Sequence, residues 1–235
     1  MREKISIVIP ILNEEKNIYP LTNRIIKYLK KNKFEIIFVD DSSKDNSKKI
    51  LKKLEKNYNF FNPIFRKKER DLCRSCFSGI EKSKFDNVLI MDGDLQHDPK
   101  YIPSMIKKIE NKNVDIVIGA RKLHKPNNRG LTEVRRFASV ILIFFFNIFD
   151  IRTADPMSGF FLFKKKIYKK NKQNFFGRGF KILVDFLINS KPKPKTIDVY
   201  IDFKRRFHNS SKMNYKILLI LIQFYIVNLF KKLFI

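Results

Sequence analysis

Residues 88–99 read VLIMDGDLQHDP, a run of four apolar residues that leads directly into three carboxylates, Asp92, Asp94 and Asp98. A short apolar run bounded by turn residues is typical of a buried β-strand. Because like charges repel at this spacing, the stretch predicts a polar turn, a metal site, or both. An isolated Asp-x-Asp is weak evidence for a metal, so the rest of the chain has to decide between these alternatives.

The first half of the chain repeats this pattern of a strand followed by a helix. Apolar, β-branched runs predict four further strands, within residues 4–13, 34–41, 62–67 and 114–121. Helical spacing of apolar residues predicts helices within 17–31, 42–57, 71–83 and 99–112. This alternation predicts an α/β fold with a mostly parallel, Rossmann-like sheet flanked by helices. Ligands bind such sheets at the carboxyl ends of the strands, where six polar residues would meet: Asn13, Glu14, Asp40, Asp41, Asp92 and Asp94.

After Arg121 the pattern changes. An apolar helix is expected within 134–149, then a short strand within 154–165, a helix within 177–190 and an alternating strand within 195–207. We expect one catalytic domain over 1–214 and a membrane-facing helix over 215–235.

The C-terminal segment is apolar but interrupted by polar residues. As a helix, residues 215–230 would be roughly 24 Å long, short of a ~30 Å hydrocarbon core. The polar positions fall within about half of a helical wheel: Lys216, Gln223, Asn228, Lys231 and Lys232. This favours an amphipathic helix lying on a membrane over a spanning one.

The composition is strongly basic, with 50 Lys and Arg against 23 Asp and Glu and a formal charge of +27. Such an excess suggests an anionic partner, either nucleic acid, an acidic membrane or a phosphorylated substrate. The alternative is compositional drift, because Lys, Asn, Ile and Phe are abundant everywhere. The chain has 7 glycines and no Gly-rich phosphate-binding motif.

The two cysteines, Cys73 and Cys76, form a single C-x-x-C without the second pair that a zinc ribbon needs. They are expected to be reduced residues on a helix. The N-terminus reads as a strand rather than a signal peptide, which predicts a cytoplasmic protein.

Asp92 and Asp94 flank a glycine at a strand end, where their oxygens can converge on Mg²⁺ or Mn²⁺. Such an ion can neutralise charge on a departing nucleoside diphosphate. Asp40 and Asp41 repeat the arrangement after the second strand, although helix capping by Asp41 and the serines after it is the alternative there. Two acidic strand ends in one sheet are more specific than either alone.

Six motifs in order resemble a known family: IVIPILNEEKNI, IIFVDDSSKDNS, MDGDLQHDP, DIVIGAR, DPMSGFFLFKK and GFKILVDFL. Together they resemble the inverting family-two glycosyltransferases with a GT-A fold, and most closely the polyprenyl-phosphate (dolichol-phosphate) mannosyltransferase branch. The similarity covers roughly residues 4–215. It implies a nucleotide-sugar donor, a divalent metal and a lipid phosphate acceptor.

The resemblance also implies roles for individual residues. The donor nucleotide would contact Pro10, Leu12, Glu14, Val39, Asp41 and Gly93, and the metal would bind Asp92, Asp94 and Gln96. Phosphate contacts are implied for Arg121 and Arg135, and donor contacts for Lys181, Arg206 and Lys212. Leu12 stands where the family usually has an aromatic residue, which leaves the nucleotide base open. Asp155 would lie near the sugar or in a structural turn, and His97 is expected in a cap or loop rather than as a base.

The sequence therefore predicts transfer of mannose or glucose from GDP-mannose or a UDP-hexose to a polyprenyl phosphate at the cytoplasmic membrane face. A lipid phosphate is already anionic, so this reaction needs no general base. One rival is transfer to a glycan hydroxyl, which needs a base such as Asp155. A nucleic-acid-binding protein would interleave aromatics with Lys and Arg, whereas these phenylalanines sit in apolar runs. A catalytically inactive membrane scaffold is disfavoured by the intact Asp-x-Asp.

Overall fold

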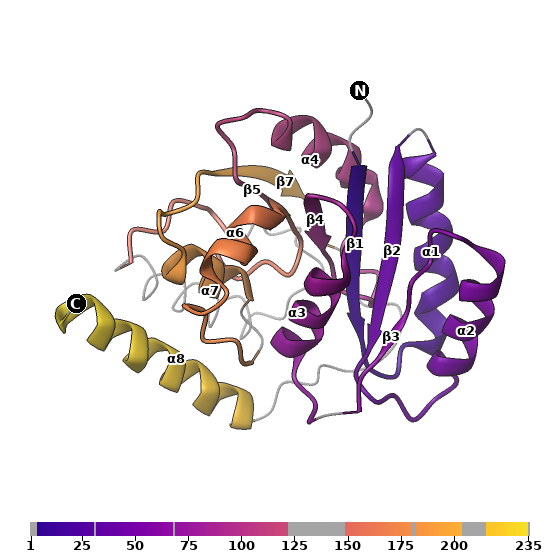
Figure 1. Ribbon diagram of the computed structural model, residues 1–235, viewed down its shortest axis with the longest axis horizontal. Helices are drawn as coiled ribbons and strands as arrows, with labels where there is room; N and C mark the ends of the chain where they lie inside the picture. The colour runs from indigo at the N-terminus through magenta and orange to yellow at the C-terminus, as the bar shows by residue number, and fades with distance from the viewer. Residues whose placement is uncertain are drawn as a thin grey trace.

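A computed structural model of the chain describes residues 4–30, 32–67, 69–121, 149–179, 182–203 and 215–234 (Figure 1). The strands are β1 Lys4–Ile11, β2 Lys33–Asp40, β3 Ile64–Phe65, β4 Asn87–Ile90, β5 Ile116–Arg121, β6 Phe161–Lys164 and β7 Thr196–Ile201. The helices are α1 Glu15–Leu29, α2 Ser47–Asn57, α3 Leu72–Lys82, α4 Ile102–Ile109, α6 Lys165–Asn171, α7 Ile182–Asn189 and α8 Tyr215–Phe234, with a 3₁₀ turn η1 at Pro99–Tyr101.

The strands form one seven-stranded sheet in the order β3-β2-β1-β4-β6-β5-β7. β1 pairs in parallel with β2 and β4, and β5 pairs in parallel with β7. β6 is inserted between β4 and β5 and is antiparallel to both. The mostly parallel α/β sheet expected from the sequence is confirmed, and the antiparallel β6 is the exception.

Helices cover both faces of the sheet, which explains why its central strands read as nearly continuous apolar runs. Alternate residues of β1, such as Ile5 and Ile7, pack toward α1, α2 and α4. Val8 points to the opposite face, where α3 and α7 supply Cys76 and Phe186. Both cysteines lie on α3, a helix as the sequence suggested, and they are free and buried.

The expected elements differ from the observed ones mainly at their ends. Within residues 99–112 the chain forms the 3₁₀ turn η1 and then α4, which ends at Ile109, because Pro103 lacks the amide hydrogen that a continuous helix from Pro99 would use. Helix α6, with the sequence KKIYKKN, was not predicted. It has seven residues, five of them Lys or Asn, and it has too little apolar periodicity for a sequence-based prediction.

Helix α8 packs on the body of the protein through one side. Phe224 contacts Phe176 with ring centroids 5.5 Å apart, and Tyr225 contacts Phe149 at 5.9 Å. The polar face expected from the helical wheel is wrong at Asn228, which is buried and donates its side-chain amide to the Phe224 carbonyl. In the described part of the chain, no helix is both long and apolar enough to cross a bilayer.

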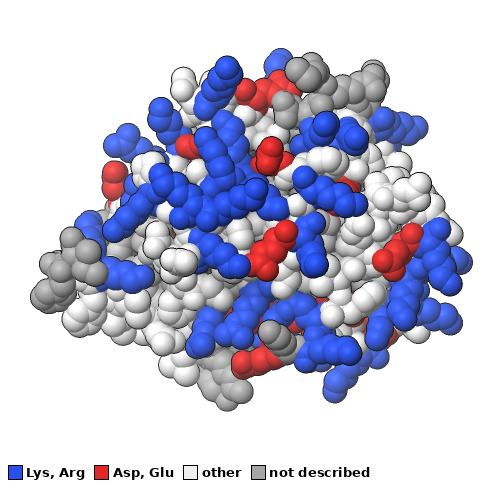
Figure 2. Space-filling model, viewed as in Figure 1, with Lys and Arg blue, Asp and Glu red and all other residues white. Residues whose placement is uncertain are grey.

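The outward side of α8 carries a stripe of large apolar residues, which we call the α8 stripe: Leu219, Ile222, Ile226 and Phe230, with exposed fractions of 60%, 47%, 47% and 59%. These positions fall on one side of a helix because their spacing is three, four and four residues. Figure 2 shows Lys and Arg side chains spread over much of the visible face, with fewer of them over α8 at the lower left. The charge is thus distributed over several elements.

Candidate active site

The acidic motifs lie at one edge of the sheet. Ile11 is paired with Asp40 across β1 and β2, and Val8 is paired with Ile90 across β1 and β4. The parallel strands therefore bring Asp41 and Asp92 out at the same edge, toward which the arrows of β1 and β2 point in Figure 1. This is the arrangement expected for a ligand site in a parallel sheet.

The turn after β4 is tightly held. A side chain at Gly93 would place its Cβ 2.7 Å from Ile11 Cγ2, so the close approach of the turn to β1 requires glycine. The Asp94 side chain accepts a hydrogen bond of 3.1 Å from the backbone amide of Gln96, and Leu95 has a left-handed backbone with φ of 64°. A left-handed leucine stores strain of the kind found at functional sites.

The Ser-Gly-Phe motif before β6 packs directly against the acidic turn. A Cβ at Gly159 would lie 2.8 Å from Asp92 Oδ2, so glycine leaves room for the carboxylate. Ser158 fixes the motif by donating a hydrogen bond of 2.7 Å to the Gly119 carbonyl on β5. Two motifs about 65 residues apart in the sequence thus form one wall of the site.

Arg121 at the end of β5 is held by Asp155. Its Nε donates to Asp155 Oδ2 at 2.6 Å and its Nη2 donates to Oδ1 at 2.8 Å, a bidentate pair. The Arg121 backbone amide also donates to Oδ2, and Asp155 is fully buried. Of the two roles the sequence left open for Asp155, the structural one accounts for these contacts.

His97 is a buried neighbour of the acidic turn rather than a cap. Its ring stacks on Phe160 with centroids 5.2 Å apart, and its Nδ1 is 3.5 Å from Asp92 Oδ2. Burial lowers the pKa of His97 to about 4, so the imidazole is neutral at neutral pH. The capping role belongs to Asp98, whose carboxylate accepts a hydrogen bond from the Lys100 amide. Sequence reasoning missed this packing because it depends on Phe160.

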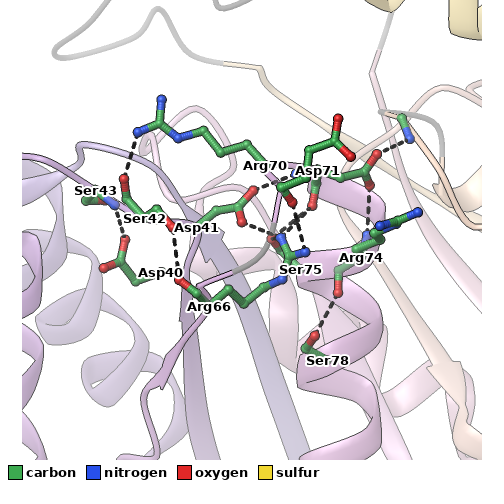
Figure 3. Close-up of polar contacts among 12 residues, drawn as sticks. Asp40, Asp41, Ser42, Ser43, Arg66, Arg70, Asp71, Arg74, Ser75 and Ser78 are labelled. Carbon is green, nitrogen blue, oxygen red and sulfur yellow. Dashed lines mark hydrogen bonds and ion pairs between the residues drawn. The ribbon is translucent and has the colours of Figure 1, made fainter.

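Asp41 sits in a different environment from Asp92. Arg66 Nη1 donates to Asp41 Oδ1 and to Ser75 Oγ, and the Asp71 amide donates to Asp41 Oδ2 at 2.8 Å (Figure 3). Asp71 in turn caps α3 at Arg74 and accepts a hydrogen bond from the Gly179 amide at 2.8 Å. Burial raises the pKa of Asp41, although the Arg66 guanidinium opposes the shift.

The sequence did not identify Arg66, which follows the short strand β3 without a recognisable motif. No role was expected for Asp71 either. Neither residue signals its partner, because the contacts to Asp41 span 25 and 30 residues.

Residues implied in nucleotide binding lie near the ends of β1 and β2. Glu14 is nearly buried and accepts a hydrogen bond from Asn17 Nδ2 at 2.7 Å. The Val39 side chain is fully buried between the sheet and α3, so a nucleotide contact would use its backbone. Pro10 is buried and Leu12 is half-buried. These four remain predictions.

Four of the implied residues lie outside the described residues: Arg135, Lys181, Arg206 and Lys212. The apolar helix expected within 134–149 and the loop at 208–214 also fall largely or wholly there. In the part of the chain that the structure describes, no three His, Cys, Asp or Glu side chains group in a way that could hold a metal ion. A metal at Asp92 and Asp94 would therefore need other ligands, such as the side-chain oxygen of Gln96 and oxygens of the substrate.

Comparison with known proteins identifies the class of this chain. Residues 6–172 match the family model described as Glycosyl transferase family 2, and the chain belongs to this family. The family assignment confirms the resemblance inferred from the motifs and the enzyme class, a glycosyltransferase.

Among individual relatives, a dolichol-phosphate mannosyltransferase from Pyrococcus furiosus is 33% identical over 91% of this chain. The chain spans only 60% of the length of that relative. A dolichol-phosphate mannosyltransferase from Saccharomyces cerevisiae is 29% identical, with 91% of this chain and 82% of the relative covered.

Solved structures confirm the GT-A fold. Glucosyl-3-phosphoglycerate synthase from Mycobacterium tuberculosis, in complex with Mn²⁺, UDP and phosphoglyceric acid, superposes with a TM-score of 0.67. The alignment covers 99% of this chain and 79% of that structure at 15% sequence identity. At this identity the likeness concerns the fold alone.

Proposed function

We propose that this chain transfers mannose or glucose from a nucleoside-diphosphate sugar to a polyprenyl phosphate, with inversion, at the cytoplasmic face of a membrane. The observation that carries the proposal is that the Arg121 guanidinium, which the buried Asp155 holds in place, interacts electrostatically with Asp92 of the acidic turn. The names of the relatives from P. furiosus and S. cerevisiae support the lipid phosphate acceptor.

Asp92, Asp94 and Gln96 are the residues that would hold Mg²⁺ or Mn²⁺. Their carboxylate and amide oxygens suit a hard cation, and the Asp92 side chain is 38% exposed at the mouth of the turn. Mn²⁺ together with UDP in the mycobacterial structure supports the proposal of a divalent metal, and the residues that would hold it are proposed from their position in this chain. Bound there, the cation would neutralise charge on the departing nucleoside diphosphate.

The cationic residues would align the two phosphate-bearing substrates. Arg121 is oriented by Asp155 and would present its guanidinium to a donor or acceptor phosphate. We propose that Arg135 contacts the acceptor phosphate, and that Lys181, Arg206 and Lys212 contact the donor. The nucleotide would lie along the ends of β1 and β2, near Glu14 and Asp41.

The environment of Asp155 favours a phosphate acceptor over a glycan hydroxyl. Asp155 was the residue that a hydroxyl acceptor would have needed as a base, and it is fully buried with both oxygens engaged by Arg121. A phosphate monoester is already ionised at neutral pH and can attack the anomeric carbon directly. Direct displacement of this kind inverts the anomeric centre.

The test is a transfer assay with radiolabelled GDP-mannose, UDP-glucose and UDP-N-acetylglucosamine and undecaprenyl phosphate in detergent. We expect one hexose donor to yield a lipid-extractable product, and the Asp94→Asn variant to yield none. Label that enters an oligosaccharide but never the lipid phosphate would favour the hydroxyl acceptor instead. The one-bond coupling between carbon and hydrogen at the anomeric centre of the product checks inversion.

We propose that the α8 stripe rests on the membrane that holds the acceptor. Four large apolar residues on one exposed side of a helix offer a surface for the acyl boundary, and Lys231 and Lys232 at the end of the helix are exposed for contact with anionic lipid. Because α8 also packs on Phe149 and Phe176, deleting the helix would uncover core residues. Substitution of the stripe is therefore the cleaner test.

Replacing Leu219, Ile222, Ile226 and Phe230 together with Ser should abolish sedimentation with vesicles of phosphatidylglycerol while donor binding is retained. Tyr19→Ser with Tyr28→Ser is the matched control, since both tyrosines are exposed on α1, at 38% and 37%. Unchanged sedimentation of the stripe variant would contradict this docking surface. Alkaline carbonate extraction separates a helix that lies on the membrane from a spanning one.

A further inference from the structure

The two residues that follow β7 contact the segment after the acidic turn at two points. Tyr101, the last residue of η1, donates its hydroxyl hydrogen to Asp202 Oδ2 at 2.8 Å, and the Asp202 amide donates to the same hydroxyl at 3.0 Å. The next residue, Phe203, places its ring 5.3 Å from the His97 ring. Residues 202 and 203 therefore contact both ends of the 97–101 segment that follows the acidic turn.

Phe203 also contacts the cationic side of the site. The Arg121 guanidinium carbon lies 5.4 Å from the centroid of the Phe203 ring, within the range of a cation–π contact. Asp155 orients the same guanidinium through Nε and Nη2. Arg121 is thus held by a carboxylate through two of its nitrogens and lies against an aromatic ring.

His97 lies between Phe203 and the Asp92 carboxylate. The imidazole is 2% exposed and lies between Phe160 and Phe203, so each ring limits its tilt. Its Nδ1 faces Asp92 Oδ2 at 3.5 Å and has no hydrogen-bond partner among the described residues. A buried polar atom of this kind is uncommon and costly, so the packing of the two phenylalanine rings has to hold the imidazole in this place.

From these contacts we propose that Phe203 is a positioning residue that fixes Arg121 directly and Asp92 through His97. The proposal rests on the proposed function, because it concerns how the phosphate-binding arginine and the metal-binding carboxylate keep their mutual geometry. A leucine would fill most of the volume but offers no π face to the guanidinium and no flat surface to the imidazole. A cation–π contact is worth a factor of about 2 to 30 in an equilibrium constant.

The test compares Phe203→Leu with Phe203→Tyr, which keeps the ring. Tyr200→Leu is the matched control, because it removes a ring three residues before Phe203, on β7, at a residue that is 57% exposed. Three quantities are measured on the full chain: the rate at which diethyl pyrocarbonate modifies His97, the affinity for Mn²⁺ with GDP and with UDP, and the steady-state constants for transfer. Thermal melting verifies that each variant is folded.

We expect Phe203→Leu to raise the rate of His97 modification at least ~10-fold and to weaken Mn²⁺-dependent nucleotide binding about 3- to 10-fold, within the cation–π range. We also expect kcat to fall more than the KM for the donor rises. Phe203→Tyr and Tyr200→Leu should resemble the wild type. A purely structural role for Phe203 would lower the melting temperature without changing metal affinity.

The proposal is overturned if His97 in Phe203→Leu stays as protected as in the wild type and Mn²⁺ affinity is unchanged. It is also overturned if Tyr200→Leu produces the same effects. The modification and binding measurements need no transfer. A wild-type protein that transfers nothing, combined with altered His97 modification and Mn²⁺ binding in Phe203→Leu, would refute the proposed acceptor and retain Phe203 as a positioning residue.

Discussion

The acidic ends of β2 and β4 look alike in the sequence and differ in the structure. VDD at the end of β2 and MDGD at the end of β4 both follow buried strands in one sheet and reach the same edge. The Asp41 side chain is 9% exposed and lies against Arg66, whereas the Asp92 side chain is 38% exposed. An acidic residue at the end of a strand can therefore belong either to the structural framework or to a binding surface.

The difference has a physical cause in the neighbouring segments. Asp41 faces the β3–α3 connection, which supplies a guanidinium and a backbone amide to its two oxygens (Figure 3). Asp92 faces the Ser-Gly-Phe motif, which contributes a glycine and so brings close packing without a side chain. A carboxylate with buried donors is expected to stabilise the fold, and an exposed one is expected to bind a ligand.

The largest effect should follow from changing the end of β4, where the Asp92 side chain is 38% exposed and Asp94 is buried beside it. Asp94→Asn should lower transfer by at least ~100-fold, because metal stabilisation of the departing charge is worth several kcal/mol. The urea midpoint should stay close to that of the wild type. EDTA should abolish activity reversibly, with recovery on adding Mn²⁺. Full activity in EDTA would show that the end of β4 binds no metal that the reaction needs. The proposed functional difference between the ends of β2 and β4 would then be wrong.

The framework end should respond in the opposite way. Asp41→Ala should lower the free energy of unfolding by about 3 kcal/mol, since it leaves the buried Arg66 charge without its carboxylate. Arg70→Ala is the control, because Arg70 is exposed and donates one hydrogen bond to the Ser42 carbonyl. It should cost under about 1 kcal/mol. Urea unfolding followed by circular dichroism measures both, and equal losses would contradict the framework role.

A smaller effect is expected from replacing Asp155. This carboxylate is buried like Asp41, but its partner Arg121 belongs to the proposed active site. Asp155→Asn keeps the volume but weakens the bidentate pair with Arg121, so kcat/KM should fall about 10- to 100-fold, the value of one charge-assisted hydrogen bond. Asp150→Asn is the control, because Asp150 and Arg152 form an exposed ion pair at 81% and 85% side-chain exposure. Steady-state kinetics with the preferred donor decide the matter. A normal rate in Asp155→Asn would mean that Arg121 acts without its carboxylate.

The sequence predicts the frame of the molecule better than its internal contacts. Apolar runs such as VLIM and the glycine between Asp92 and Asp94 are local signals, and the fold expected from them is confirmed. The internal contacts are less local, because the pairs Asp41–Arg66 and Arg121–Asp155 join residues 25 and 34 positions apart. Neither motif contains a local signal that predicts which residue it will contact. His97 lies in a loop, as expected, but its burial was missed for the same reason, since it depends on Phe160 and Phe203.

The insertion of β6 between β4 and β5 has a consequence for folding while the chain is being synthesised on the ribosome. Asp92, Asp94 and Arg121 are all synthesised by residue 121, yet the strands that carry them are neighbours only through β6, which spans Phe161–Lys164. Until that strand has emerged and paired, the acidic turn and the arginine have no common scaffold. Pairing between strands that are far apart in the sequence is slow, and until it happens the unpaired strand edges can pair incorrectly. A nascent chain stalled before β6 would therefore carry most of the active-site motifs and still lack an active site.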